Sequence, residues 1–199
     1  MHSRSLLKSL AVGAIALLLI TSCRAGGEPK LQLPAVKLGN NISVVVHDVK
    51  FTDTVYYHCS GTETSSICGT AEANYFVSAS APDRELFLAL VEVANRDSEI
   101  IIMHVGNKGY TVLDEQGVAL PSTNPFGSTR RLAPTIPAKE SLYSFIWGKF
   151  EIPKQKSITA WTIFEIPKTV NPWQVRWDTV ETVFVNLYKE SERPNPRKV

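Results

Sequence analysis

The chain is built, from Asn41 onward, of short apolar segments rich in β-branched and aromatic residues, each bounded by Gly, Pro, Asn or Asp. Such side chains suit a pleated surface and such bounding residues form turns, so the pattern predicts β-strands. Residues 85–95 are ambiguous, because Leu86 and Leu90 also have helical spacing. We predict a strand there, since the segment contains β-branched valines and its neighbours are strands.

About eight strands in roughly 150 residues predict an all-β fold, a Greek-key β-sandwich over residues 41–189. A hydrophobic fraction of 44% and a charged fraction of 20% are ordinary for one globular domain, and they exclude a disordered polyelectrolyte and a polytopic membrane protein. Residues 190–199 are polar and contain Pro194 and Pro196, so we predict a flexible C-terminal tail.

The N-terminus has the organisation of an export signal. Arg4 and Lys8 precede an unbroken run of eleven apolar or small residues at positions 10–20, and small residues follow the run. Eleven helical residues span about 16 Å, too short for a bilayer core of about 30 Å. We therefore predict a signal peptide over residues 1–22.

The tetrapeptide Ile20-Thr21-Ser22-Cys23 resembles the bacterial lipobox. The resemblance implies cleavage before Cys23, a diacylglyceryl group on its sulfur and fatty acylation, such as palmitate, on its new amino group. Two or three acyl chains suffice for stable membrane attachment. Residues 23–40 would then be a lipidated Cys and a flexible tether rich in Gly and Pro, on the extracytoplasmic face of a bacterial membrane. The alternative is an ordinary secretory signal with an incidental Cys.

Lipidation of Cys23 would leave Cys59 and Cys68 in a compartment that permits disulfides, and we predict that they are bonded. Closing this loop of about ten residues would stabilise the fold by roughly 2.5–3 kcal/mol on the chain-entropy model. A zinc site is the weaker alternative, because it needs four ligands and only His58 lies beside this pair.

The charge balance gives no reason to expect nucleic acid. The chain has 21 Lys and Arg against 19 Asp and Glu, and removal of Arg4 and Lys8 with the signal leaves 19 of each. Nucleic-acid binding requires a concentrated positive face, and a balanced charge of 19 against 19 gives no indication of one.

The sequence contains no signature of catalysis, and we predict neither enzymatic activity nor a cofactor. No GxSxG elbow or phosphate-binding Gly-rich loop is present. The histidines of the mature chain, His47, His58 and His104, are isolated in predicted strands. Copper is the best metal candidate, with Met103 and His104 joined by another of these histidines, but Met103 lies between apolar residues as a core residue would.

Aromatic residues are either a core layer or a binding platform. Tyr143, Phe145 and Trp147 share one face of a strand predicted over residues 141–152, with Trp161 on the neighbouring strand. This arrangement favours a core layer over a platform for glycan or protein.

Two other pairs are the candidates for a binding surface. Trp173 and Trp177 lie in a segment that we interpret as a connection, because Asn171 and Pro172 precede it, and we expect one of them to be exposed. Arg130 and Arg131 lie in a long irregular connection over residues 121–137.

Four motifs carry a resemblance to a known group. These are a strand ending in Asn95, a strand ending in Asp114 three residues before Gly117, a turn led by Pro137, and the Phe-x-x-Pro that ends at Pro153. Their order resembles that in a widespread group of bacterial lipoproteins of unknown function with an immunoglobulin-like domain, related to the mycobacterial secreted immunoprotective antigens. The resemblance implies an immunoglobulin-like sandwich in the cell envelope, and it carries over no catalytic residue.

The chain departs from this group at Ala138, where relatives usually carry Gly, and in the Cys59–Cys68 loop. Together the observations predict a membrane-anchored, non-catalytic lipoprotein that binds a protein or an envelope polymer through its loops or a sheet edge. A sandwich that binds a small ligand, a glycan or copper is the alternative.

Overall fold

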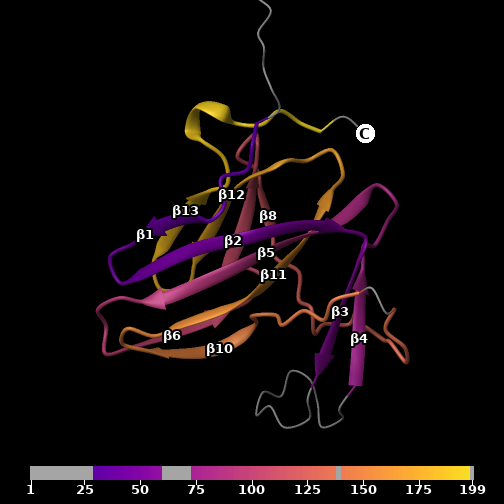
Figure 1. The fold of residues 1–199 in the computed structure, drawn as a ribbon, viewed down its shortest axis with the longest axis horizontal. Coiled ribbons are helices and arrows are strands. Elements are labelled where there is room, and N and C mark those ends of the chain that lie inside the picture. Colours follow the sequence, from indigo (N-terminus) through magenta and orange to yellow (C-terminus); the bar gives the residue numbers. More distant parts are fainter. Residues whose placement is uncertain (1–28, 60–72, 138–139, 198–199) are drawn as a thin grey trace, which may run out of the picture.

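The computed structural model describes residues 29–59, 73–137 and 140–197, and these fold almost entirely into antiparallel β-structure (Figure 1). The strands and the single 3-10 turn of these residues are β1 Ala35–Leu38, β2 Ile42–Thr52, β3 Thr54–Cys59, β4 Ala73–Ser78, β5 Arg84–Asn95, β6 Ile100–Val105, β7 Tyr110–Asp114, β8 Ala119–Pro121, β9 Arg131–Leu132, β10 Gly148–Pro153, β11 Ser157–Pro167, β12 Pro172–Asp178, β13 Thr182–Asn186 and η1 Glu190–Glu192.

The first sheet has the order β1-β2-β5-β11. Its central strand β5 is apolar on both alternating faces because both faces are covered. Phe87 and Val91 face the main core on the inner side, whereas Leu86 and Leu88 face a second core on the outer side. The prediction of a strand rather than a helix over residues 85–95 is thus confirmed.

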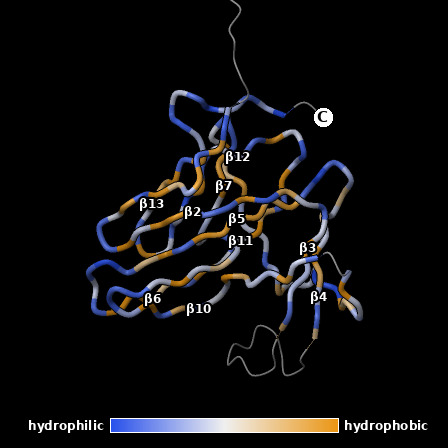
Figure 2. Tube along the Cα trace, viewed as in Figure 1, coloured by the Kyte–Doolittle hydropathy of each residue, from blue (hydrophilic) through white to orange (hydrophobic). Residues whose placement is uncertain are grey.

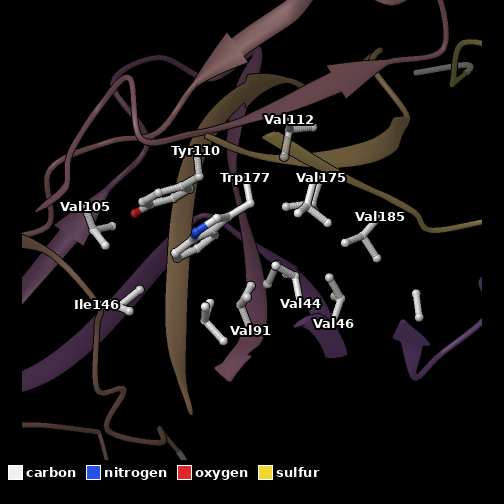
Figure 3. Packing of buried hydrophobic residues seen from close by; sticks show 14 of the residues in the cluster. Val44, Val46, Val91, Val105, Tyr110, Val112, Ile146, Val175, Trp177 and Val185 are labelled. Atoms are coloured by element: carbon white, nitrogen blue, oxygen red, sulfur yellow. The ribbon is translucent and has the colours of Figure 1, made fainter. Parts of the chain in front are cut away.

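A second layer packs on the inner face of the first sheet and completes the sandwich. It consists of the sheet β13-β12-β7-β8 and the two-stranded antiparallel sheet β10-β6. Valines and aromatic side chains from both layers interdigitate around Trp177 and Tyr110 (Figure 3), and apolar residues concentrate along the strands that face this core (Figure 2). The predicted all-β sandwich is confirmed, and the described residues form more strands than the expected eight.

A third layer covers one end of the outer face. The sheet β3-β4-β9 packs Val55, Tyr57 and Val77 on Leu86 and Leu88, and this second core is separate from the first. The remainder of the outer face lies beyond this layer, and its side chains are exposed or half-buried.

The prediction of one strand over residues 141–152 is wrong in its first half. Residues 141–147 run across the first sheet and make only isolated bridges, one of them between Phe145 and Trp161, before β10 begins at Gly148. Gly148 has φ +97°, a conformation that strand residues with a Cβ avoid, so the chain changes direction there. The connection predicted over residues 121–137 likewise contains the short strand β9.

Both predicted ends of the domain are also corrected. The predicted tether 23–40 contains β1, which pairs with β2, and the backbone N–H of Gln32 donates to the carbonyl of Leu187. In the predicted tail 190–199, the described residues 190–197 pack on the domain. Arg197 donates to the carbonyls of Thr169 and Val170, and its guanidinium pairs with the buried carboxylate of Glu85.

These segments could not be assigned from local pattern, since their partners lie far away in the sequence.

In the part of the chain that the structure describes, no helix is both long enough and apolar enough to cross a membrane.

Candidate functional site: a groove between two sheet edges

The two layers of the sandwich each end in an unpaired strand on the same side of the molecule. β1 is the last strand of the first sheet, β13 is the last strand of the second, and they lie side by side (Figure 1). A groove of about 620 Å³ lies along both strands. Its lining is formed by Gln32, Pro34, Ala35, Val36, Lys37, Leu38, Gly39, Gln174, Thr182, Val183, Phe184, Asn186, Tyr188, Lys189 and Glu190.

The backbone of β1 turns hydrogen-bonding groups towards this groove. Gly39 donates to the carbonyl of Ile42, which makes these two residues a hydrogen-bonded pair of the antiparallel ladder. Hydrogen-bonded pairs alternate along such a ladder, so the N–H and C=O groups of Val36 and Leu38 point away from β2. Within the described chain, neither residue makes a backbone hydrogen bond outside its ladder.

The backbone of β13 follows the same alternation. Leu187 donates to the carbonyl of Trp173, which sets the phase of the β12–β13 ladder. The backbone groups of Thr182, Phe184 and Asn186 therefore point outward from β13. The groove is thus bordered by two strand edges with free donors and acceptors, a surface on which another strand can pair.

Apolar side chains are exposed along the same edges. Val36 is 57% exposed, Leu38 is 60% exposed and Phe184 is 40% exposed. The guanidinium of Arg176 lies over the Phe184 ring, 5.7 Å from its centroid. Natural proteins usually blunt an edge with unpaired backbone groups and apolar side chains, so this edge is a candidate docking surface.

At one end of the groove, Tyr188 belongs to a pair of buried aromatic residues. Tyr188 is buried and stacks on Trp173 with ring centroids 6.3 Å apart, and the Arg193 guanidinium lies 5.6 Å from the Trp173 centroid on that stack. Burial raises the pKa of Tyr188, so its hydroxyl stays protonated at neutral pH. This end of the groove therefore consists of a packed aromatic pair beside the Arg193 cation.

The expectation that Trp173 or Trp177 is exposed is wrong. Trp177 is fully buried, and Trp173 is 7% exposed. The segment is strand β12, in which Trp173, Val175 and Trp177 alternate towards the main core. The period-2 spacing of these three apolar residues was the signal of a half-buried strand, and the Asn-Pro before it marks only where the strand begins.

The predicted arginine pair lies elsewhere. Arg130 is half-buried with its guanidinium 4.7 Å from the centroid of the Tyr75 ring, and Arg131 is exposed on β9. Neither residue lines the groove. The residues that do line it, such as Val36 and Phe184, were not predicted, because a strand edge is a property of the sheet order and not of the local sequence.

The histidines are dispersed. His47 Nε2 lies 2.8 Å from Glu92 Oε2, and His58 Nδ1 lies 2.9 Å from Asn74 Oδ1. Met103 is buried in the main core whereas His104 is exposed on the opposite face of β6, so the two cannot hold one copper ion together. Across the described residues, no three His, Cys, Asp or Glu side chains come close enough to hold a metal.

Two of the predicted cysteine sites fall outside the described residues. Cys23 and Cys68 are not among them, while Cys59 is buried at the end of β3. Lipidation of Cys23 and the Cys59–Cys68 disulfide therefore stay predictions.

The carboxylate of Glu181 holds the two edges together. It accepts hydrogen bonds from the backbone N–H groups of Asn40, Asn41 and Ile42, each at 2.8 Å, so the turn before β13 binds the β1–β2 turn. Burial raises the pKa of Glu181, but these three hydrogen bonds and the nearby Arg96 outweigh it, and the net pKa lies below the ordinary value. A Cβ on Gly39 would collide with this carboxylate, which accounts for glycine there.

Replacing Glu181 by glutamine is expected to lower the free energy of unfolding by about 1 kcal/mol at pH 7, because charge-assisted hydrogen bonds are lost at a largely exposed site. The folded pKa of Glu181 is depressed, so its stabilisation is present above about pH 4.5 and is lost as the pH falls through the folded value. Thermal unfolding between pH 7 and pH 3.5 should show a steeper loss for the wild type than for Glu181→Gln. Parallel curves would contradict this role, and Glu151→Gln, at an exposed pair with Lys149, is the matched control.

No known family model matches this chain, and no curated protein matches it. Three solved structures are similar to it in fold. One is the candidate lipoprotein ycdA of Bacillus subtilis, which is 13% identical with a TM-score of 0.45. The match covers 81% of this chain and 41% of the ycdA chain. The yjhA protein of Bacillus subtilis is 11% identical, covers 82% of this chain and 90% of its own, and has a TM-score of 0.45.

The third is an uncharacterized β-sandwich protein of Clostridium difficile, 6% identical, which covers 79% of this chain and 93% of its own with a TM-score of 0.40. None of the matches is to a mycobacterial secreted antigen, so that part of the predicted resemblance stays a prediction.

Proposed function

We propose that this protein is a lipid-anchored, non-catalytic binding module of a bacterial cell envelope, and that its edge groove receives an extended segment of a partner protein. The observation that carries the proposal is the pair of unpaired strand edges, β1 and β13, with outward backbone groups and exposed apolar side chains. The anchor is supported by the lipobox-like sequence that ends at Cys23.

The groove suits strand addition. An incoming extended chain pairs its backbone with the outward N–H and C=O groups of Val36 and Leu38, and this pairing supplies affinity for any sequence in the right conformation. Alternate side chains of the incoming segment then lie beside Val36 and Leu38, which share one exposed face of β1 and favour apolar residues at every second position. The Glu181 contact fixes the spacing of the two edges before the partner arrives.

The groove carries no evident catalytic set. Its described lining contains no His, Cys, Ser or Asp, and its charged groups are Lys37, Lys189 and Glu190. The Thr182 hydroxyl donates to Asp178 Oδ1 at 2.6 Å, but among the described residues no histidine or cysteine lines the groove, and a binding role accounts for the exposed apolar edge more directly than hydrolysis does.

The test is site-specific photo-crosslinking in living cells. A photoreactive residue at position 36 is expected to capture one protein through an extended segment, whereas the same residue at Val118, which is 52% exposed at the distant β7–β8 turn, is expected to capture none of it. Crosslinked peptides identified by mass spectrometry give the segment. Equal capture from both positions would contradict the proposal.

A backbone variant separates strand addition from ordinary side-chain contact. The N–H of Leu38 points outward, so Leu38→Pro removes one donor from the edge without removing a rung of the β1–β2 ladder. Capture from position 36 should fall at least tenfold, while the melting temperature shows whether β1 is still folded. Val36→Lys, which places a charge on the edge, is the second variant, and unchanged capture with both variants folded would rule out pairing at β1.

A further inference from the structure

The part of the first sheet's outer face that the β3-β4-β9 layer leaves uncovered is a second candidate binding surface, with polar, apolar and aromatic side chains. The β3-β4-β9 layer covers Leu86 and Leu88 at one end, and the remaining outward side chains lie beside it. The register places Leu90 between Asp48 on β2 and Trp161 on β11. All three are half-buried side chains on the open face.

Three aromatic side chains, Tyr143, Phe145 and Trp161, border this face, and we call them the aromatic step. Tyr143 meets Trp161 edge to face, with centroids 5.3 Å apart at 77°, and Phe145 lies nearly parallel to Tyr143 at 6.3 Å. Tyr143, Phe145 and Trp161 pack on the second core beneath them, and each of the three side chains is half-buried. Fixed aromatic rings beside a few polar groups are typical of ligand sites, and they complement the apolar C–H faces of pyranose rings.

One unpaired cation lies on this step. The Nζ atom of Lys50 is 5.2 Å from the Trp161 centroid and 5.4 Å from the Tyr143 centroid, and the side chain is exposed. Within the described chain, no carboxylate lies within ion-pair distance of Lys50. Its charge is therefore available to a ligand that approaches the rings.

The two carboxylates of the face, Asp48 and Glu92, each have a hydrogen-bond partner. Glu92 is bonded to His47 at 2.8 Å, and this contact, together with Ser157, holds the pKa of Glu92 below its ordinary value. Asp48 accepts a hydrogen bond from the backbone N–H of Val49. The face therefore offers hydroxyl-binding groups at one end and a free positive charge beside aromatic rings at the other.

We propose that this face binds an acidic polysaccharide, a polymer of pyranose rings that carry carboxylates. A carboxylate of the polymer pairs with Lys50, its ring stacks against the Trp161–Tyr143 step, and its hydroxyls reach the His47–Glu92 pair. A peptide cannot bind here by strand addition, because β5 is paired on both sides and its backbone groups are used. This site is independent of the edge groove.

The test is binding of the purified mature domain to polygalacturonate by isothermal titration and affinity electrophoresis. Fully methyl-esterified polygalacturonate is the matched neutral probe, and polyglutamate is the matched acidic polypeptide. We expect binding to polygalacturonate at least tenfold tighter than to either of the other polymers. Equal binding to the esterified polymer, equal binding to polyglutamate, or no binding to polygalacturonate would each overturn the proposal.

Two variants locate the site. Lys50→Gln changes an exposed side chain and should weaken binding to polygalacturonate about tenfold or more, while Lys108→Gln, an exposed lysine in the β6–β7 turn, should leave it unchanged. Trp161→Ala should abolish measurable binding, with Trp161→Phe retaining part of it if the alanine variant fails to fold. Wild-type affinity in Lys50→Gln, or an equal loss in Lys108→Gln, would contradict binding on this face.

Discussion

Replacing Trp177 by alanine is expected to lower the free energy of unfolding by about 3–5 kcal/mol, enough to unfold a marginal domain. The indole is fully buried between the two layers, and it stacks on Tyr110 with centroids 5.5 Å apart at 13° (Figure 3). Its Nε1 donates to the hydroxyl of Thr179 at 2.8 Å. Truncation removes the stacking and the transfer free energy together, and it leaves a cavity where the strands of both sheets meet.

The matched control is Tyr110→Phe. Among the described residues, the Tyr110 hydroxyl makes no hydrogen bond of good geometry, although Ser122 and the Ile163 backbone are polar neighbours, so its removal should change the free energy of unfolding by less than about 1 kcal/mol. Burial raises the pKa of this hydroxyl, which keeps it neutral at all ordinary pH values. Denaturant titration of both variants measures the difference. A loss of similar size in the two would mean that the sandwich is not organised around the Trp177–Tyr110 stack.

Replacing Cys23 by alanine is expected to move nearly all of the protein from the membrane fraction to the soluble fraction of the envelope. Each buried CH₂ of an acyl chain contributes about 0.8 kcal/mol, so two or three chains dominate the partitioning, and without the sulfur no diacylglyceryl group can be attached. Fractionation with detergent extraction measures the shift, and the mass of the N-terminal peptide of the wild type reports the lipid directly.

Ser22→Ala is the control for the same experiment, because it keeps a small residue before the cysteine and should leave the protein in the membrane. A wild-type peptide with an unmodified Cys23 and an uncleaved leader would contradict the anchor. With β1 assigned to the domain, eight residues separate Cys23 from the hydrogen-bonded Gln32, and the nine steps between the two Cα atoms span at most about 32 Å. The domain of an anchored protein would thus be held nearer the bilayer than a tether of residues 23–40 allows.

The local pattern of apolar residues predicts a strand correctly where that pattern directly reflects which faces of the strand are buried. β5 was identified because a strand covered on both faces is apolar at every position, and the alternation in β2 likewise follows from one buried face. The same rule, applied to Trp173, Val175 and Trp177, would have identified β12, and the prediction failed there because Asn171-Pro172 was interpreted as a connection.

The site could not be predicted from local pattern, since it depends on contacts across the whole chain. Glu181 binds the backbone of residues 40–42, which lie about 140 positions earlier, and no spacing rule relates the two. The position of β1 and β13 as sheet edges likewise follows from the strand order alone. Short polar ends of a domain were interpreted as flexible, whereas Arg197 packs on the Phe51 ring and pairs with Glu85.

Amide hydrogen exchange of the domain, alone and in its photo-crosslinked complex, tests the edge groove most directly. The amides of Val36, Leu38 and Phe184 point away from their ladders, so they should exchange rapidly in the free protein and slow by at least tenfold in the complex. The ladder amides of Lys37 and Val185 should be protected in both states. Outward amides that exchange equally fast with the partner attached would show that the partner does not pair with these strands.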